Sequence, residues 1–121
     1  MDIESYWKAT VNQDEKSMKT FFNEKAIIKW PNTNEVFDVD KFILANCKYP
    51  GSWKGEIIRI EDLGELIITV VKIKSKMDSI SLHAISFFKI KNDKIYELEE
   101  YFSEDDTPPE WRVELFKNNN N

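Results

Sequence analysis

The stretch SLHAISFFKI, residues 81–90, contains His83, the single histidine of the chain. A histidine titrates near neutral pH, so it can serve as a general acid or base. Ile85 and Phe87 follow it at alternate positions and share its side of a strand. This pattern favours an apolar pocket wall that carries one proton-transfer group. A histidine that is simply hydrogen-bonded within the fold is the structural alternative.

A carboxylate for His83 is available in the stretch ELEEYF. The two-residue turn Asn92–Asp93 makes the two strands antiparallel neighbours. Counting outward from this turn sets His83 opposite Phe102, with Glu100 beside it. A carboxylate beside a histidine fixes its tautomer. We therefore expect His83 and Glu100 to be the catalytic pair, and a one-residue bulge would exchange Glu100 for Glu99.

Aromatic and amide side chains elsewhere complete the candidate pocket. Four tryptophans in so small a domain exceed what packing alone requires. Asn46 lies on the apolar side of a predicted helix, where it either bonds to a loop backbone or anchors a ligand. Tyr6, Tyr101 or Trp30 is expected to donate a hydrogen bond to a developing oxyanion. The residues expected to line the pocket are Tyr6, Trp7, Trp30, Asn46, Trp53, Ile85, Phe87 and Tyr101.

The elements that would position these residues are helical in the first half and extended in the second. Apolar spacing predicts a helix over 3–11 capped by Asp2, a short helix after an Asn12–Glu15 capping box, a strand over 26–30, and a helix that begins at Asp38 or Asp40 and ends before YPG. Runs rich in β-branched and aromatic residues predict strands over 53–61, 65–76, 80–91 and 94–103.

Short turns between the four long strands require an antiparallel meander. Helices followed by such a sheet predict an α+β fold, in which the helices pack on the concave face of a curved sheet and form a cone. The strand over 80–91 is apolar on both sides. Because the helices cover one face, we expect a homodimer that covers the other.

Composition limits the class of partner. The chain has 121 residues and a net charge of −5 with no basic stripe, which disfavours nucleic acid. No apolar run reaches membrane-spanning length, and the acidic start MDIESYWK is unlike a signal peptide, so we expect a cytoplasmic protein. No phosphate loop, dinucleotide motif or metal-ligand set predicts a cofactor. One domain over 1–115 is expected, with Trp111 docked on it and a disordered Asn-rich tail over 116–121.

The order of elements resembles the nuclear transport factor 2-like superfamily and, within it, the SnoaL-like proteins. The resemblance is carried by YWKATVNQDEKSMKTFFNEKAIIKWPNTNEVF, by ANCKYPGSWKGEI and by KIYELEEYFSEDDTPPEWR. It covers about residues 3–115 and implies a cone-shaped fold. The superfamily includes isomerases, polyketide cyclases, dehydratases and non-catalytic binding proteins, so the resemblance does not select one chemistry.

The resemblance extends to ketosteroid isomerase-like members, which use a tyrosine on the first helix and acids near the first strand and on the sheet. Tyr6 matches the tyrosine, but Trp30 stands where a carboxylate is expected. Steroid isomerisation is therefore not carried over. Two functions remain: a cofactor-independent isomerase, cyclase or dehydratase that binds a small hydrophobic molecule, or a non-catalytic binding or dimerisation module whose cavity is filled.

Overall fold

The computed structural model describes residues 1–117, which form four α-helices, one short 3₁₀ helix and six strands. The first half of the chain contains α1 (Ile3–Val11), α2 (Glu15–Lys19), β1 (Phe22–Trp30), η1 (Pro31–Thr33), β2 (Glu35–Phe37) and α3 (Val39–Lys48). The second half contains β3 (Trp53–Asp62), β4 (Leu66–Ser75), β5 (Ser81–Lys91), β6 (Lys94–Glu104) and α4 (Glu110–Lys117). The predicted order of three helices with one strand among them, followed by four long strands, is confirmed, whereas β2 and α4 were not predicted.

Aspartates begin the first three helices. The carboxylates of Asp2, Asp14 and Asp38 each accept a hydrogen bond from the backbone N–H three residues later, which pairs a donor that the helix itself leaves free. The predicted capping box over Asn12 and Glu15 is wrong, because Asn12 ends α1 and Asp14 begins α2. Asp14, and not Asn12, therefore defines the start of the second helix.

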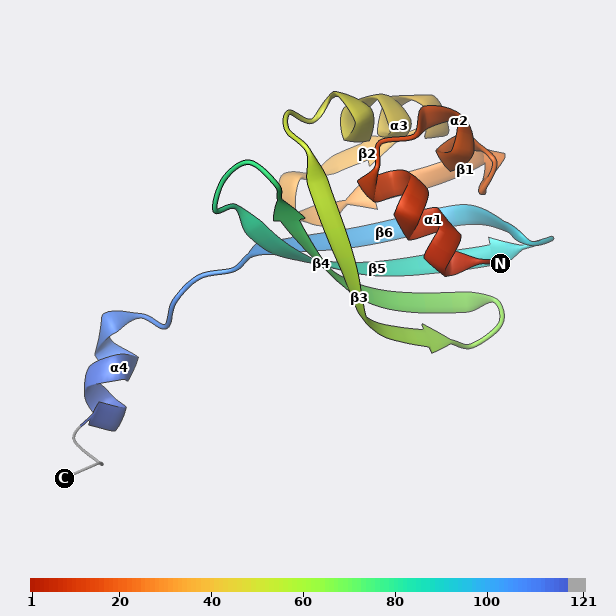
Figure 1. Cartoon of the computed structure of the whole chain (residues 1–121). Coiled ribbons are helices and arrows are strands. Elements are labelled where there is room, and N and C mark those ends of the chain that lie inside the picture. Colours follow the sequence, from red (N-terminus) through yellow and green to blue (C-terminus); the bar gives the residue numbers. More distant parts are fainter. Residues whose placement is uncertain (118–121) are drawn as a thin grey trace.

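The strands form one sheet in the order β2-β1-β6-β5-β4-β3 (Figure 1). Neighbouring strands are antiparallel, except that β1 runs parallel to β6. Asn92 and Asp93 connect β5 to β6 with φ angles of 52° and 58°, as a tight two-residue hairpin requires. β1 is longer than the predicted strand over 26–30, and the three-residue β2 was not predicted.

A bulge next to this hairpin changes the register of β6. Lys89 lies opposite Glu97 and Ile90 opposite Ile95, so Tyr96 has no residue opposite it. Beyond the bulge His83 pairs with Ser103, not with Phe102 as the uniform count predicts. Every residue of β6 after Tyr96 is displaced by one position relative to β5.

The side of β5 that faces the helices is the opposite of the side that we expected. Ala84, Phe88 and Ile90 are buried against the helices, on what we call the concave face. His83, Ile85 and Phe87 alternate with them and lie on the opposite side, the outer face. The expectation that these three residues line a helix-covered pocket is therefore wrong. Both sides of β5 are apolar, so alternation alone did not identify the inner side.

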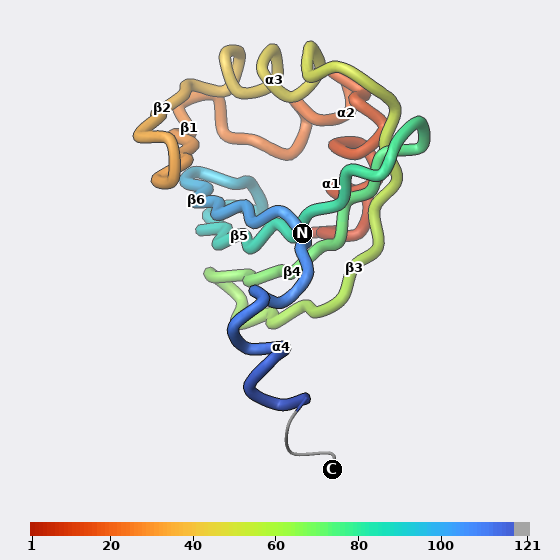
Figure 2. The backbone as a smooth tube through the Cα atoms, turned by 90° about the vertical axis from the view of Figure 1, so that its left-hand side faces the viewer, coloured from red at the N-terminus to blue at the C-terminus, as the bar shows by residue number. Residues whose placement is uncertain are grey.

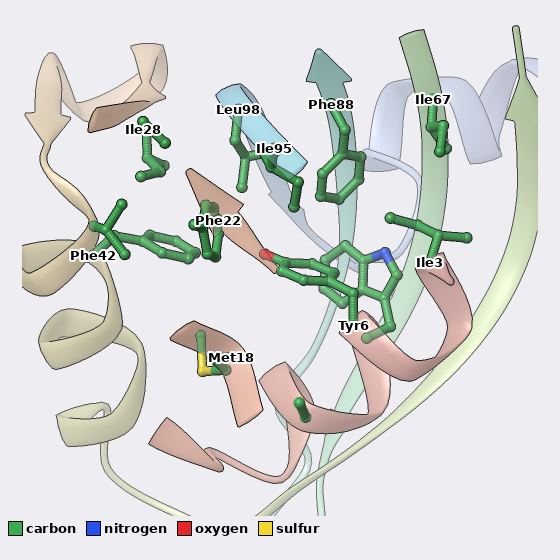
Figure 3. Close-up of a cluster of buried hydrophobic side chains, with 14 of the residues drawn as sticks. Ile3, Tyr6, Met18, Phe22, Ile28, Phe42, Ile67, Phe88, Ile95 and Leu98 are labelled. Carbon is green, nitrogen blue, oxygen red and sulfur yellow. The ribbon is translucent and has the colours of Figure 1, made fainter. Parts of the chain in front are cut away.

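Helices α1, α2 and α3 pack on the concave face (Figure 2), and aromatic rings fill the space between them and the sheet (Figure 3). Tyr6 and Phe88 are fully buried and meet edge to face at 5.1 Å between ring centroids. Gly55 of β3 allows α1 to approach closely, because a Cβ there would lie 2.7 Å from Cγ2 of Val11. The interior around Tyr6 and Phe88 is a packed core.

The C-terminal helix α4 stands clear of the sheet at the end of an extended segment (Figure 1). Trp111 is 66% exposed, so the expectation that it docks on the domain is wrong. Residues 116 and 117 belong to α4, so the predicted disordered tail does not begin at 116. The rest of that predicted tail, residues 118–121, lies outside the described residues.

Candidate active site on the concave face

His83 contacts a different carboxylate from the one expected. Its Nδ1 bonds to Oδ1 of Asp105, just beyond β6, and the Ser81 hydroxyl donates to Oδ2 of Asp105 at 2.5 Å. The His83 side chain is 37% exposed. The hydrogen bond from Ser81, followed by the contact with His83, lowers the pKa of Asp105. The predicted His83–Glu100 pair is therefore not formed.

Glu100 is buried on the concave face, where the bulge in β6 places it opposite Ser86. The Ser86 hydroxyl donates to Oε2 at 2.6 Å, and the Trp30 indole Nε1 donates to Oε1 at 3.1 Å. Burial raises the pKa of Glu100, although both donors act against that rise. No cation within residues 1–117 forms an ion pair with it. A carboxyl held only by neutral donors is suited to changing its protonation state.

Glu100 ends a polar row that crosses the apolar concave face. Thr69 of β4 lies opposite Ser86 of β5, which lies opposite Glu100 of β6. All three are at most 3% exposed. The Trp7 indole donates to the Thr69 hydroxyl at 3.0 Å, so each end of the row is bonded by a tryptophan. Trp7 and Trp30, predicted as aromatic wall residues, thus each donate a hydrogen bond to a polar side chain of this row.

Tyr6 adds a hydroxyl with no partner. Its oxygen is buried and has no hydrogen-bond partner within the described part of the chain. Burial and, to a lesser degree, the negative charge of Glu100 raise the pKa of Tyr6 well above its usual value, while the nearby Thr10 hydroxyl, which is also buried without a hydrogen-bond partner of proper geometry, acts against that rise. The phenol therefore stays protonated and remains a donor. An unpaired buried donor costs about 1–3 kcal/mol, which a bound acceptor would recover.

Aromatic rings cover Glu100 on the side of η1. The Trp30 ring lies edge-on to Phe37, Phe42 and Phe102, with centroids 4.8, 6.0 and 5.4 Å away. Phe102 is 38% exposed, and Trp30 is only partly buried. The Trp30 ring is thus both a hydrogen-bond donor to Glu100 and a partly exposed part of its cover.

The other residues predicted to line the pocket do not meet at Glu100. The Asn46 side chain donates to the backbone carbonyl of Thr10 at 2.9 Å, which joins α3 to α1 and supports its structural interpretation. Tyr101 lies on the outer face with Ile85 opposite it, so the expectation that it lines the inner pocket is wrong. Trp53 is buried at the start of β3, and its indole nitrogen has no partner in the described chain.

Trp53 instead borders a separate cavity of about 300 Å³ between α1 and β3, together with Trp7, Gly55 and Val71. A second hollow of about 540 Å³ lies on the surface between the β4–β5 turn and the segment after β6, where Lys72 and Asp105 border it. Neither wall includes Glu100 or His83. The expected cavity with His83 on its wall is therefore not among these hollows.

Sequence reasoning did not identify Ser86, Thr69 or Asp105. Ser86 had a detectable signal, because it is the one polar residue in the alternating set that also contains Ala84 and Phe88. Asp105 follows the predicted end of its strand, and nothing in its spacing indicated a bond to His83. Within residues 1–117 no group of three or more histidine, cysteine or acidic side chains could hold a metal ion. None of the helices over the same residues has the length and apolar character needed to span a membrane.

Comparison with known proteins identifies the architecture. No family model matches the sequence, and neither does any curated protein. Among solved structures, an NTF-2 like protein of unknown function from Burkholderia xenovorans LB400 matches with a TM-score of 0.78 and 23% identity, over 93% of this chain and 88% of the other.

Two further structures connect the fold to named activities. A candidate ketosteroid isomerase from Kribbella flavida DSM 17836 matches with a TM-score of 0.78 and 18% identity, over 93% of this chain and 83% of the other. A candidate SnoaL-like polyketide cyclase from Shewanella putrefaciens CN-32 matches with a TM-score of 0.67 and 18% identity, over 80% of this chain and 74% of the other. At these identities the likeness concerns the fold alone. The chain therefore has the nuclear transport factor 2-like fold, the cone-shaped α+β architecture that its sequence predicts.

Proposed function

We propose that this protein binds a small hydrophobic carbonyl compound on the concave face of the sheet and that Glu100 exchanges a proton with it. The observation that carries the proposal is the burial of this carboxyl with only neutral donors around it. Burying an unpaired carboxylate is costly, so a purely structural position would favour an apolar side chain. A raised pKa at such a position is typical of acid–base sites.

The chemistry needs only side chains of this chain. The Glu100 carboxylate removes a proton from the carbon next to the carbonyl, and the electron pair of that C–H bond becomes the enolate. The Tyr6 hydroxyl donates a hydrogen bond to the enolate oxygen. In a β,γ-unsaturated carbonyl compound the enolate is conjugated with the C=C bond, so the Glu100 carboxyl can return its proton to the γ carbon while the C=C bond moves next to the carbonyl, which completes an isomerisation without a cofactor. Ser86 holds the carboxyl in place during both transfers.

Entry to Glu100 requires the Trp30 ring to move, because the interior around Glu100 is packed. The cover formed by Trp30, Phe37 and Phe102 is the partly exposed part of that packing. A flat hydrophobic ligand would replace the contacts that Trp30 makes with these rings. Ligand binding and movement of Trp30 are therefore one step in this proposal.

The structural neighbours support this class of substrate. They include a candidate ketosteroid isomerase and a candidate polyketide cyclase, and ketosteroids and polyketides are both hydrophobic carbonyl compounds. Steroid isomerisation itself is not proposed, because Trp30 stands where the resemblance expects a carboxylate. The proposal thus names a substrate class and a proton-transfer residue.

Hydrogen–deuterium exchange next to a ketone carbonyl tests the proposal. Bicyclic and tricyclic ketones are screened in D₂O by NMR with the wild-type chain, Glu100→Gln and Glu99→Gln. We expect wild type and Glu99→Gln to accelerate exchange on at least one ketone, and Glu100→Gln to lose about a hundredfold or more of that acceleration. Glu99 is the matched control because it is the adjacent carboxylate on the outer face. Equal acceleration by all three chains would exclude Glu100 as the proton-transfer residue.

A non-catalytic binding or dimerisation module is the second candidate, and the filled interior favours it. Tyr6, Phe42 and Phe88 are at most 1% exposed on the concave side. If this candidate is correct, the protein accelerates hydrogen–deuterium exchange on no ketone, and no ketone raises the melting temperature of the protein. A ligand at 100 times its dissociation constant stabilises a folded protein by about 2.7 kcal/mol, which a thermal shift detects readily.

A further inference from the structure

The C-terminal helix α4 exposes apolar side chains that nothing in its own chain covers. None of its eight residues is buried. An isolated helix of this length is marginal in water, because helices of fewer than about 12 residues depend on packing. The apolar residues of α4 are Trp111, Val113, Leu115 and Phe116, which are 48–66% exposed.

Three of the four polar residues of α4 lie together on one side of the helix. Glu110, Glu114 and Lys117 fall within a narrow arc of the helical wheel, whereas Arg112 lies within the wide arc that holds the apolar residues. The Arg112 guanidinium lies over the Trp111 ring, 5.4 Å from its centroid. Half of the helix surface is therefore suited to packing against an apolar partner.

The outer face of the sheet carries an apolar patch of matching kind. Ile68 lies opposite Phe87, and Val70 lies opposite Ile85, which in turn lies opposite Tyr101. Phe87 and Tyr101 meet edge to face at 6.2 Å. Ile85 is 37% exposed, and helices α1–α3 pack on the other side of the sheet (Figure 2). These five residues, which we call the outer patch, form a continuous surface over three strands.

The connection between β6 and α4 holds the helix away from the patch of its own chain. The Asp105 N–H donates to the Ser81 carbonyl at 2.9 Å, and its carboxylate is bonded to Ser81 and His83. Pro108 and Pro109 follow, and a residue before proline favours an extended backbone. The chain thus leaves the sheet in a fixed direction and continues outward to α4 (Figures 1 and 2).

We propose that two copies of this chain form a dimer in which α4 of each copy packs on the outer patch of the other. One exchange covers both apolar surfaces in both copies, and the arrangement closes under twofold symmetry. The five residues over 105–109 reach about 17 Å when extended, so α4 can lie that far from the sheet of its own chain.

Charges beside the two surfaces match this arrangement. Lys72 lies opposite His83 on the outer face, next to the outer patch. Within residues 1–117 neither Lys72 nor Glu110 takes part in an ion pair, although Lys72 lies close enough to Asp105 to help lower the pKa of that carboxyl. The acidic start of α4 therefore has an available basic partner at the edge of the patch. The dimer leaves the concave face free, so the proposal does not depend on the one for Glu100.

Analytical ultracentrifugation of the full chain tests the proposal. We expect wild type to sediment as a dimer, and Trp111→Glu and Ile85→Lys each to raise the dimer dissociation constant about tenfold or more. Leu44→Glu is the matched control, because Leu44 is 57% exposed on α3, away from both surfaces, and this variant should dimerise as wild type does. Far-UV circular dichroism establishes that each variant is folded. A monomeric wild type, or a dimer that Trp111→Glu leaves intact, would overturn the proposal.

A disulfide trap tests which copy receives the helix. Leu115→Cys and Ile85→Cys are introduced together into a Cys47→Ser chain, and the protein is oxidised and run on a non-reducing gel. We expect a covalent dimer that reduction returns to monomer. A crosslink formed within one chain would show that α4 folds back on its own sheet, and no crosslink would show that α4 does not reach the patch. Either result rejects the exchange.

Discussion

At the scale of single residues, two carboxyls that are adjacent in the sequence, Glu99 and Glu100, have very different environments. Glu99 and Glu100 are neighbours in sequence but lie on opposite faces of β6, because successive side chains of a strand alternate. Glu100 is buried and bonded to Ser86 and Trp30, whereas Glu99 lies on the outer face opposite Phe87. The acid–base chemistry we propose therefore depends on position and not on residue type.

The raised pKa of Glu100 predicts a pH dependence of stability. A folded-state pKa above the unfolded value means that the folded chain holds its proton at higher pH, so stability is lost as pH rises from the unfolded pKa through the folded one. We expect the free energy of unfolding of wild type to fall relative to Glu100→Gln as pH rises from about 4 upward. Urea unfolding at pH 4, 5.5 and 7 measures this difference. Parallel pH profiles for the two chains would contradict it, and Glu99→Gln should follow wild type.

At the scale of elements, turn chemistry made the strands predictable. The four long strands were predicted to within a residue or two, because Gly64, Asp78 and the Asn92–Asp93 pair separate them. The bulge at Tyr96 has no such signature, since the surrounding residues are ordinary strand formers. The fold was therefore accessible from sequence, but the register that selects Glu100 and separates it from His83 was not.

The close approach of α1 to β3 gives an element-scale prediction. Gly55→Ala places a methyl group 2.7 Å from Cγ2 of Val11, so one of the two elements must shift. We expect a loss of about 1–3 kcal/mol in the free energy of unfolding by urea. The same substitution in a Val11→Ala chain should cost less, because the space is then available. An equal cost in both backgrounds would assign the effect to the strand backbone alone.

At the scale of the whole molecule, the two proposals use opposite sides of one sheet. The concave face carries Glu100 under helices α1–α3, and the outer face carries the patch to which α4 is proposed to bind. Substitutions on one side should therefore leave the function of the other unchanged. This separation lets Glu100→Gln report on chemistry and Ile85→Lys report on assembly within the same protein.

The exchange of α4 also predicts how stability depends on protein concentration. Because dimerisation is linked to folding, the midpoint of urea unfolding should rise as the wild-type concentration increases. A chain ending at Asp105 lacks α4 and should show one midpoint at all concentrations. At high dilution the two chains should agree within about 0.5 kcal/mol, since no residue of α4 is buried on its own domain. A concentration-dependent midpoint in the shortened chain would indicate that the sheets associate without the helix.

The unpaired Tyr96 has a consequence for how proteins of this shape diversify. This extra residue decides which side chains of the final strand face inward: if Tyr96 were paired regularly, Glu99 would take the place opposite Ser86 and Glu100 would turn outward. The inner position would keep a carboxyl, but Glu97 and Tyr101 would replace Leu98 and Phe102 as the inward-facing residues on either side of it. Gain or loss of this bulge is thus a route by which evolution could change the surroundings of a reactive group while the scaffold is preserved.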